Sequence, residues 1–168
     1  SHTNVYSLSV ALAFTATISK TRYYLLIRNC TDKFGTTTKK EKCKMKKFNN
    51  NFIIGIDHGY GNMKTANCCF PTGVAAYDKE PVFKDNMLVW NERYYLIGVE
   101  HKAFMPEKML DEDYYVLTLA AIARELNIAK VYSADVFIAA GLPLTWVSGQ
   151  KEEFRQYLLQ NETVDFTF

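Results

Sequence analysis

The sequence has few cysteines, and their spacing predicts neither a metal site nor a disulfide framework. The four are Cys30, Cys43, Cys68 and Cys69; they form no Cys-x-x-Cys pair, and no histidine stands at zinc-finger spacing. We interpret the adjacent Cys68 and Cys69 as small apolar side chains on opposite faces of a strand. This cysteine usage favours a reducing, cytoplasmic compartment.

The sequence also lacks an apolar run long enough to cross a membrane. Val5 to Ile18 is uncharged and mostly apolar, but it is shorter than the roughly 20 residues that a spanning helix needs. No basic residue precedes this run, and no convincing small-x-small cleavage site follows it, so a signal peptide is not indicated. We therefore predict no transmembrane segment.

Prolines are scarce and charge is divided unevenly along the chain. With 168 residues, 48% of them hydrophobic, and only four prolines, the chain is long enough for one globular domain with or without an appendage. Residues 1–51 hold ten Lys or Arg against two acidic residues, whereas residues 52–168 hold ten against sixteen. We therefore expect residues 1–51 to be a basic and apolar extension outside the fold, and residues 52–168 to form the domain.

A lysine-rich tract, Lys39 to Asn51, ends the basic part, with six lysines in its first nine residues. Such an arm could bind nucleic acid or an anionic lipid surface. However, it has no interleaved aromatic residues for base stacking, and lysine runs are commonly solvated linkers. A third interpretation is that Met45 is a natural start, which would make residues 1–44 an upstream extension of the reading frame.

The acidic part reads as short strands followed by helices. The continuous apolar run "FIIGI" predicts a strand covered on both faces. Two further strands with turn-length connections predict an antiparallel meander, and two apolar runs flanking Asn91-Glu92 predict a β-hairpin. The expected elements are strands 52–56, 63–70 and 72–77, a hairpin at 87–99, a helix starting at the acidic residues 111–113, a strand at 132–143, a helix capped by Ser148, and a strand at 163–168. Because the last strand runs to the final residue, we expect the sequence to stop partway through a larger protein.

The chain contains neither of the two best-known glycine-rich phosphate loops, GxxxxGK[ST] and GxGxxG opening a helix. It has instead a strand that ends in Asp57, a turn containing Gly59 and Gly61, and then Lys64. Backbone N–H groups from Gly59 to Asn62 can converge on an anion, and Lys64 adds a point charge. Asp57 would face a phosphate-bound Mg²⁺ through water, because magnesium sheds its waters reluctantly.

The stretch "IIGIDHGYGNMK" resembles the first phosphate motif of the actin, Hsp70 and sugar-kinase superfamily, a strand followed by DxGxxxxK. The GYG in the turn and the later GLP at residues 141–143 are more similar to bacterial and archaeal actin-like proteins of the plasmid-partitioning (ParM-like) type. The resemblance implies an α/β fold, a ribonuclease H-like (actin-like ATPase) domain. Its mixed sheet would begin with an antiparallel three-strand meander and carry flanking helices.

The resemblance also implies roles for residues of the motif. Asp57 would be the Mg²⁺-side carboxylate, Gly59, Tyr60, Gly61 and Asn62 the backbone cradle for the phosphates of ATP or GTP, and Lys64 the phosphate lysine. Many members of the family have serine or threonine where this sequence has Tyr60. A second domain supplies the remaining nucleotide contacts and the groups that act on water, so we assign no catalytic residue and expect this chain alone to be inactive.

By the same resemblance, the full-length protein would be an ATPase that self-associates into filaments and segregates plasmid DNA, with a DNA-binding adaptor protein as a possible partner. Two alternatives stay open. One is a fragment of a sugar or acetate kinase of the same superfamily. The other is an adaptor that binds nucleic acid or a membrane through the basic arm.

Overall fold

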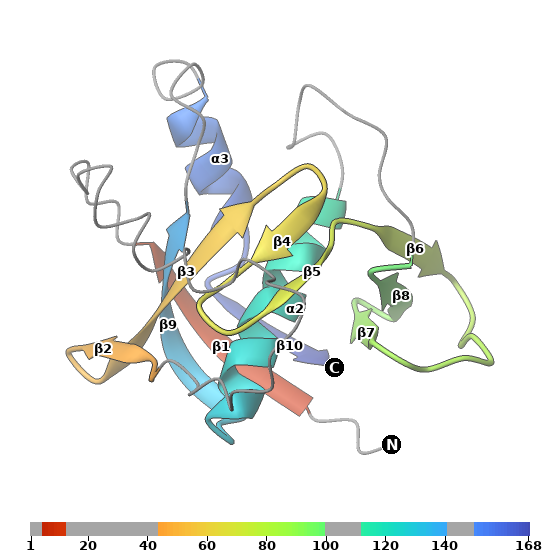
Figure 1. Ribbon diagram of the computed structural model, residues 1–168, viewed down its shortest axis with the longest axis horizontal. Coiled ribbons are helices and arrows are strands. Elements are labelled where there is room, and N and C mark those ends of the chain that lie inside the picture. Colours follow the sequence, from red (N-terminus) through yellow and green to blue (C-terminus); the bar gives the residue numbers. More distant parts are fainter. Residues whose placement is uncertain (1–4, 13–43, 100–111, 141–149) are drawn as a thin grey trace, which may run out of the picture.

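The computed structural model describes residues 5–12, 44–99, 112–140 and 150–168, and of residues 5–12 it describes the backbone alone. These residues form ten strands and two helices (Figure 1). Their bounds are β1 Val5–Leu12, β2 Lys46–Phe48, β3 Asn51–His58, β4 Asn62–Lys64, β5 Cys69–Pro71, β6 Val74–Tyr77, β7 Met87–Trp90, β8 Arg93–Ile97, α2 Asp113–Ile128, β9 Ser133–Ala140, α3 Lys151–Leu158 and β10 Thr163–Thr167.

The strands form one mixed sheet in the order β5-β4-β3-β9-β1-β10-β7-β8-β6, and β2 pairs with β3 outside this path. Strand β9 is parallel to both of its neighbours, β3 and β1, while the other pairs are antiparallel. A mixed α/β architecture was expected, and the structure confirms it.

The expected meander is present, but its third strand lies earlier in the chain than the sequence predicts. Strands β3, β4 and β5 pair antiparallel in succession. The segment 63–70, predicted as one strand, contains β4, a turn at residues 65–68 and the start of β5, because the backbone N–H of Thr65 donates to the Cys68 carbonyl at 2.8 Å and closes the turn. Residues 74–77 instead form β6, which pairs with β8. Cys68 is half-buried in the turn and Cys69, which begins β5, is exposed, so the interpretation of the two as small apolar side chains on opposite faces of a strand was wrong.

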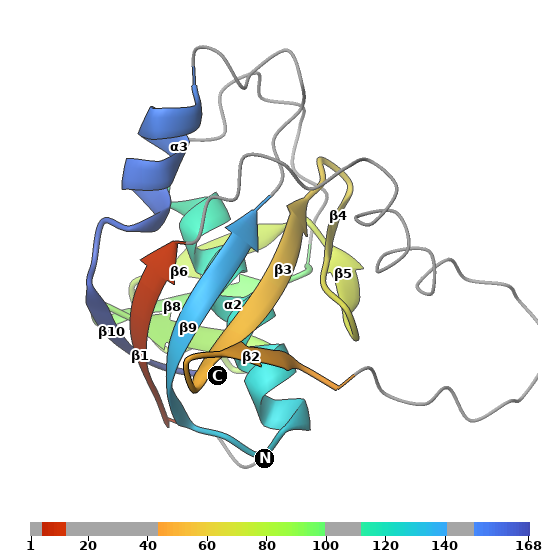
Figure 2. The same ribbon diagram turned by 90° about the vertical axis from the view of Figure 1, so that its left-hand side faces the viewer.

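Helix α2 is the centre of the hydrophobic core. Its side chains are buried without interruption from Tyr114 to Ala123, since the sheet packs against it from more than one side. Figure 2 shows β1, β9 and β3 side by side with α2 behind them, and Figure 1 shows β6, β7 and β8 on the other side of α2. Side chains from both groups of strands share one core with the helix; they include Ile54, Ile56, Leu88, Tyr95, Val136 and Ile138. This packing makes α2 the support for the strand ends described below.

Helix α3 supplies a cap for α2. The Tyr157 hydroxyl accepts a hydrogen bond from the backbone N–H of Tyr115 at 2.7 Å, and this amide belongs to the first turn of α2, where helix N–H groups lack partners within the helix. Glu112 is the N-cap residue, but its side chain makes no cap hydrogen bond. Burial of Phe154 and Leu158 holds α3 in place. The two helices therefore form one connected unit.

Two segments of the basic N-terminal part belong to the sheet. Strand β1 pairs with β9 and β10, and β2 pairs with β3. The expectation that residues 1–51 lie outside the fold does not hold for these segments, because pairing with β9, β10 and β3 gives their backbone N–H and C=O groups hydrogen-bond partners. That Met45 is a natural start stays a prediction.

Other predictions concern residues outside the described ranges: Asp111 at the expected helix start, the GLP at 141–143 and the Ser148 cap. The hairpin at Asn91-Glu92 is confirmed, and both residues have positive φ, 49° and 60°, as a tight two-residue hairpin turn requires. In the described part of the chain, no helix has the length and hydropathy needed to cross a membrane.

Candidate phosphate-binding hairpin

Asp57 and Lys64 lie opposite each other where β3 meets β4. They are direct register partners, and Lys64 Nζ lies 4.0 Å from Asp57 Oδ2, with 39% of the Lys64 side chain and 36% of the Asp57 side chain exposed. The neighbouring pair, His58 and Met63, is buried. Since successive side chains of a strand point to opposite faces, the core holds His58 and Met63 while the two charges point away from it.

The two glycines of the turn differ in the space that surrounds them. A Cβ on Gly59 would lie 2.4 Å from the backbone oxygen of Asn62, so this position needs glycine. A Cβ on Gly61 would meet nothing within 4 Å. Glycine therefore avoids a side-chain clash at position 59 but is not needed for that reason at position 61. Gly61 instead leaves open space beside the backbone, which is the arrangement that close approach of a ligand requires.

Thr72 stabilises the turn through two hydrogen bonds to its backbone carbonyls. Its backbone N–H donates to the Gly61 carbonyl at 3.0 Å and its hydroxyl donates to the Gly59 carbonyl at 2.8 Å, and the residue is fully buried. In a trans peptide the C=O and the following N–H point in opposite directions, and the described residues contain no cis bond. The N–H groups of Tyr60 and Asn62 therefore point away from Thr72.

The other two residues of the predicted cradle lie at the surface of the turn. Tyr60 is half-buried, and burial raises the pKa of its phenol above the ordinary value. Asn62 is exposed and begins β4. The structure thus brings all six predicted site residues into one hairpin, with Asp57 on β3, Asn62 and Lys64 on β4, and the other three in the turn between them.

A buried histidine connects this turn to both helices. His58 Nε2 lies 2.8 Å from Thr118 Oγ1 on α2, and Thr118 Oγ1 donates to the Tyr114 carbonyl at 2.7 Å. Because the single hydroxyl proton of Thr118 is used in that second bond, we assign the proton between the two side chains to His58 Nε2. The His58 ring also meets the Phe154 ring of α3 edge-on, with centroids 5.3 Å apart.

A second anchor lies at the far end of β4. The buried Glu125 carboxylate of α2 accepts three hydrogen bonds from the 65–68 turn: from Thr65 Oγ1 at 2.5 Å, from the Asn67 backbone N–H at 2.7 Å and from Asn67 Nδ2 at 2.8 Å. Thr118 and Glu125 are seven residues apart, hence two helical turns or about 10 Å along one face of α2. The hairpin is therefore hydrogen-bonded to α2 at two places: at His58, beside the turn, and at the 65–68 turn that follows β4.

The sequence analysis did not predict which residues hold the hairpin in place, namely Thr72, Thr118 and Glu125. Thr118 and Glu125 interrupt an apolar helix at a spacing that places both on the same face. Polar side chains within a buried helix need hydrogen-bond partners, and this signal could have indicated that α2 holds a polar segment of the chain. Thr72 gives no comparable signal, because threonine is common in turns.

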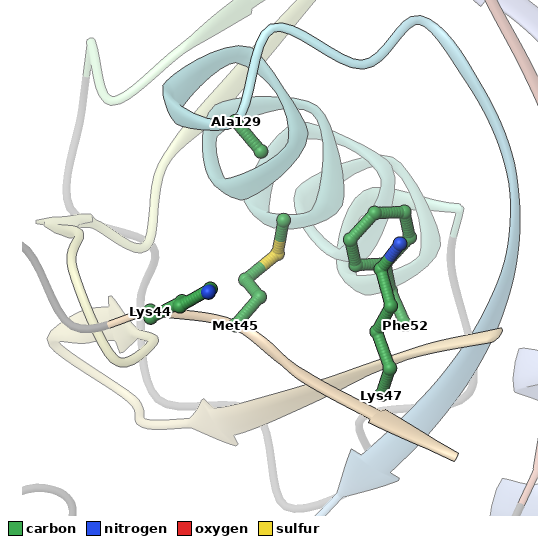
Figure 3. A pocket seen from close by; sticks show the side chains of 5 residues that line it. All are labelled: Lys44, Met45, Lys47, Phe52 and Ala129. Atoms are coloured by element: carbon green, nitrogen blue, oxygen red, sulfur yellow. The ribbon is translucent and has the colours of Figure 1, made fainter. Parts of the chain in front are cut away.

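One cavity lies at the opposite end of β3. It has a volume of about 450 Å³ and is lined by Lys44, Met45, Lys47, Phe52 and Ala129. Figure 3 shows Met45 directed toward Ala129, and Lys47 Nζ lies 4.3 Å from the centre of the Phe52 ring. Phe52 and Asp57 are five residues apart on one strand, a separation of about 16 Å. The cavity is therefore separate from the hairpin.

The charges of the hairpin suit a phosphate with its magnesium ion better than a metal ion alone. Among the residues that the structure describes, no three His, Cys, Asp or Glu side chains gather closely enough to hold a metal. A single carboxylate beside a lysine fits a Mg²⁺ that keeps its water and is shared with phosphate oxygens. The open space at Gly61 and the orientation of the amides fit the phosphate.

Comparison with known proteins identifies the family. Residues 55–167 match the family described as "Actin like proteins N terminal domain". Neither the curated proteins nor the solved structures gave a match. The family match covers most of the chain and includes the hairpin, α2 and the strands up to β10. This chain therefore belongs to the actin-like proteins and carries their N-terminal domain.

Proposed function

We propose that this chain is the nucleotide-binding half of an actin-like ATPase of the ribonuclease H-like type. The geometry of the Gly59–Asn62 turn gives the most direct support. Thr72 keeps two carbonyls on one side of the turn, so two amide N–H groups face the other way. Backbone amides arranged in this manner form an anion site.

The side chains beside the turn provide the charges that a Mg-nucleotide needs. Lys64 neutralises phosphate oxygens, and Asp57 orients water bound to Mg²⁺. Their mutual contact, at 4.0 Å and partly exposed, is loose enough for both to turn toward a ligand. Bound Mg²⁺ would supply charge neutralisation between the phosphates. The family resemblance implies ATP or GTP as the ligand, and the hairpin does not distinguish the two because its proposed contacts are with the phosphates.

The cofactor site proposed here covers the phosphates alone. Phosphoryl transfer depends on positioning and on charge stabilisation of the reacting groups. By resemblance, the second domain of actin-like proteins supplies the remaining contacts. We therefore expect this chain to bind nucleotide weakly and to hydrolyse it negligibly by itself.

In the full-length protein, we propose that Mg-ATP drives self-association into filaments that segregate plasmid DNA, with a DNA-binding adaptor as partner. Right-angle light scattering of the full-length protein tests this. Wild type and the exposed-lysine control Lys79→Ala should assemble on addition of Mg-ATP, while Asp57→Ala and Lys64→Ala should not. Assembly that persists in both variants would show that the hairpin is structural. ATP turnover without filaments in wild type would favour a kinase of the same superfamily.

A further inference from the structure

His58 belongs to the proposed phosphate hairpin, although its side chain points into the core. In sequence it stands between Asp57, whose side chain is 36% exposed, and Gly59, where a Cβ would meet the Asn62 backbone oxygen. His58 itself is only 3% exposed. Because consecutive residues are joined by rigid peptide planes, a displacement of His58 also moves the Asp57 carboxylate and the tight turn at Gly59.

The His58 ring contacts both helices. Its Nε2 lies 2.8 Å from Thr118 Oγ1 of α2, and the ring meets the Phe154 ring of α3 edge-on, with centroids 5.3 Å apart. The centroid of the Tyr114 ring, also on α2, lies 6.4 Å from that of His58. The Thr118 hydroxyl is itself oriented by the bond that it donates to the Tyr114 carbonyl at 2.7 Å. His58 is therefore attached to a buried part of α2, which is a rigid support for a binding site.

Thr72 and His58 fix different properties of the turn. Thr72 donates hydrogen bonds to the carbonyls of Gly59 and Gly61 and so sets the conformation of the turn itself. His58 bonds to α2 instead, and so sets where the turn lies relative to the helix. In binding and catalytic sites, a misplacement of about 1 Å can cost on the order of 100-fold. A phosphate site therefore needs both the correct turn conformation and the correct turn position.

We propose that His58 is a positioning residue for the phosphates of the Mg-nucleotide and that it acts through its hydrogen bond to Thr118. The bond keeps Asp57 and the Gly59–Asn62 turn at one position relative to α2, so its loss lowers nucleotide affinity although both side chains lie in the core. By linkage the effect is reciprocal, because a bound nucleotide stabilises the same hairpin position and with it the His58–Thr118 bond. This inference rests on the proposed function, since it concerns the same phosphate site.

Substitutions of Thr118 in the full chain test this hydrogen bond, with NMR titration of Mg-ATP as the measure of affinity. Thr118→Val removes the hydroxyl at nearly constant volume, and we expect the Kd for Mg-ATP to rise about tenfold. Thr118→Ser keeps the hydroxyl but loses a buried methyl group, so it should be less stable and yet bind within about threefold of wild type. Tyr115→Phe, on the same helix, loses the hydrogen bond from Asn161; it is the matched control and should keep its affinity.

The outcomes distinguish a failure of the positioning role from a failure of the phosphate site. Equal affinities of Thr118→Val and Thr118→Ser, or an equal loss in Tyr115→Phe, would overturn the positioning role alone. If Thr118→Val does not fold, wild type provides the measurement: Mg-ATP should slow solvent exchange of the His58 Nε2 proton by at least about threefold in ¹H–¹⁵N NMR. An unchanged exchange rate together with shifted amides in the Gly59–Asn62 turn would overturn the positioning role. No amide shifts in the wild-type turn would contradict the phosphate site, and the positioning role with it.

Discussion

Lys64 and Asp57 are direct cross-strand neighbours in the β3–β4 hairpin, with Lys64 Nζ 4.0 Å from Asp57 Oδ2 and both side chains partly exposed. An exposed ion pair at this distance adds little to stability, about 0–1 kcal/mol. The pair therefore has little structural value, and its charges are available to a ligand.

Replacement of Lys64 distinguishes a role in nucleotide binding from a role in the stability of the fold. We expect Lys64→Ala to change the free energy of unfolding by less than about 0.5 kcal/mol, as the control Lys79→Ala does, while it weakens Mg-ATP binding at least tenfold. Urea denaturation and calorimetric titration measure the two quantities. A stability loss above about 2 kcal/mol with unchanged nucleotide affinity would mean that Lys64 serves the fold.

The two glycines of the turn form a matched pair of substitutions. Gly59→Ala places a methyl group 2.4 Å from the Asn62 backbone oxygen, and we expect it to destabilise the protein by about 1–3 kcal/mol. Gly61→Ala meets no atom within 4 Å and should keep or slightly raise stability. It should nevertheless weaken nucleotide binding, because its methyl group fills the open space. Equal effects of the two on stability would contradict the geometry of the turn.

The Glu125 anchor should be costly to remove. Glu125→Ala leaves the Thr65 hydroxyl and two donors of Asn67 without their acceptor, and we expect a loss of about 2–4 kcal/mol in the free energy of unfolding. Glu153→Ala on the exposed face of α3 is the control and should change it by less than about 0.5 kcal/mol. In a double-mutant cycle, Thr65→Val should cost less in the Glu125→Ala background than in wild type; simple additivity would refute the coupling.

The raised pKa values of the buried tyrosine phenols predict that the protein loses stability in alkali. Burial raises the pKa of Tyr115 above its ordinary value, opposed in part by the hydrogen bond that Asn161 donates to its hydroxyl. The unfolded chain therefore releases this proton first, so stability is full below pH about 10 and falls as the pH rises beyond it. Burial also raises the pKa of Tyr60 and Tyr95. Denaturation of Tyr115→Phe between pH 8 and 11 should show a shallower fall than wild type; an identical fall would be inconsistent with a buried phenol.

Much of the hairpin and its support follows from local sequence patterns. A continuous apolar run defines β3, the DxGxxxxK spacing places Asp57 and Lys64 on either side of one turn, and helical periodicity with an acidic start defines α2. These features depend on residues close together in the chain. The sequence therefore predicted the elements that carry the site.

The features that were not predicted from the sequence depend on contacts between residues far apart in the chain. The turn at residues 65–68 lies within a stretch of strand-forming composition, and it is held by Glu125, 58 residues beyond Asn67. Insertion of β1 between β9 and β10 joins the start of the chain to its last strand. The buried Glu125 indicates that α2 needs a polar partner, but no local pattern identifies Asn67 as that partner or β9 and β10 as the neighbours of β1, because these partners are far away in the sequence.

The central claim, that the Gly59–Asn62 turn binds the phosphates of a Mg-nucleotide, is tested most directly by two-dimensional ¹H–¹⁵N NMR of this chain during titration with Mg-ATP, a method suited to weak binding. We expect the largest shift changes at the amides of Tyr60, Gly61 and Asn62, and their loss in Lys64→Ala but not in Lys79→Ala. Shift changes confined to the lysine-rich tract, or none in the turn at saturating Mg-ATP, would contradict the claim.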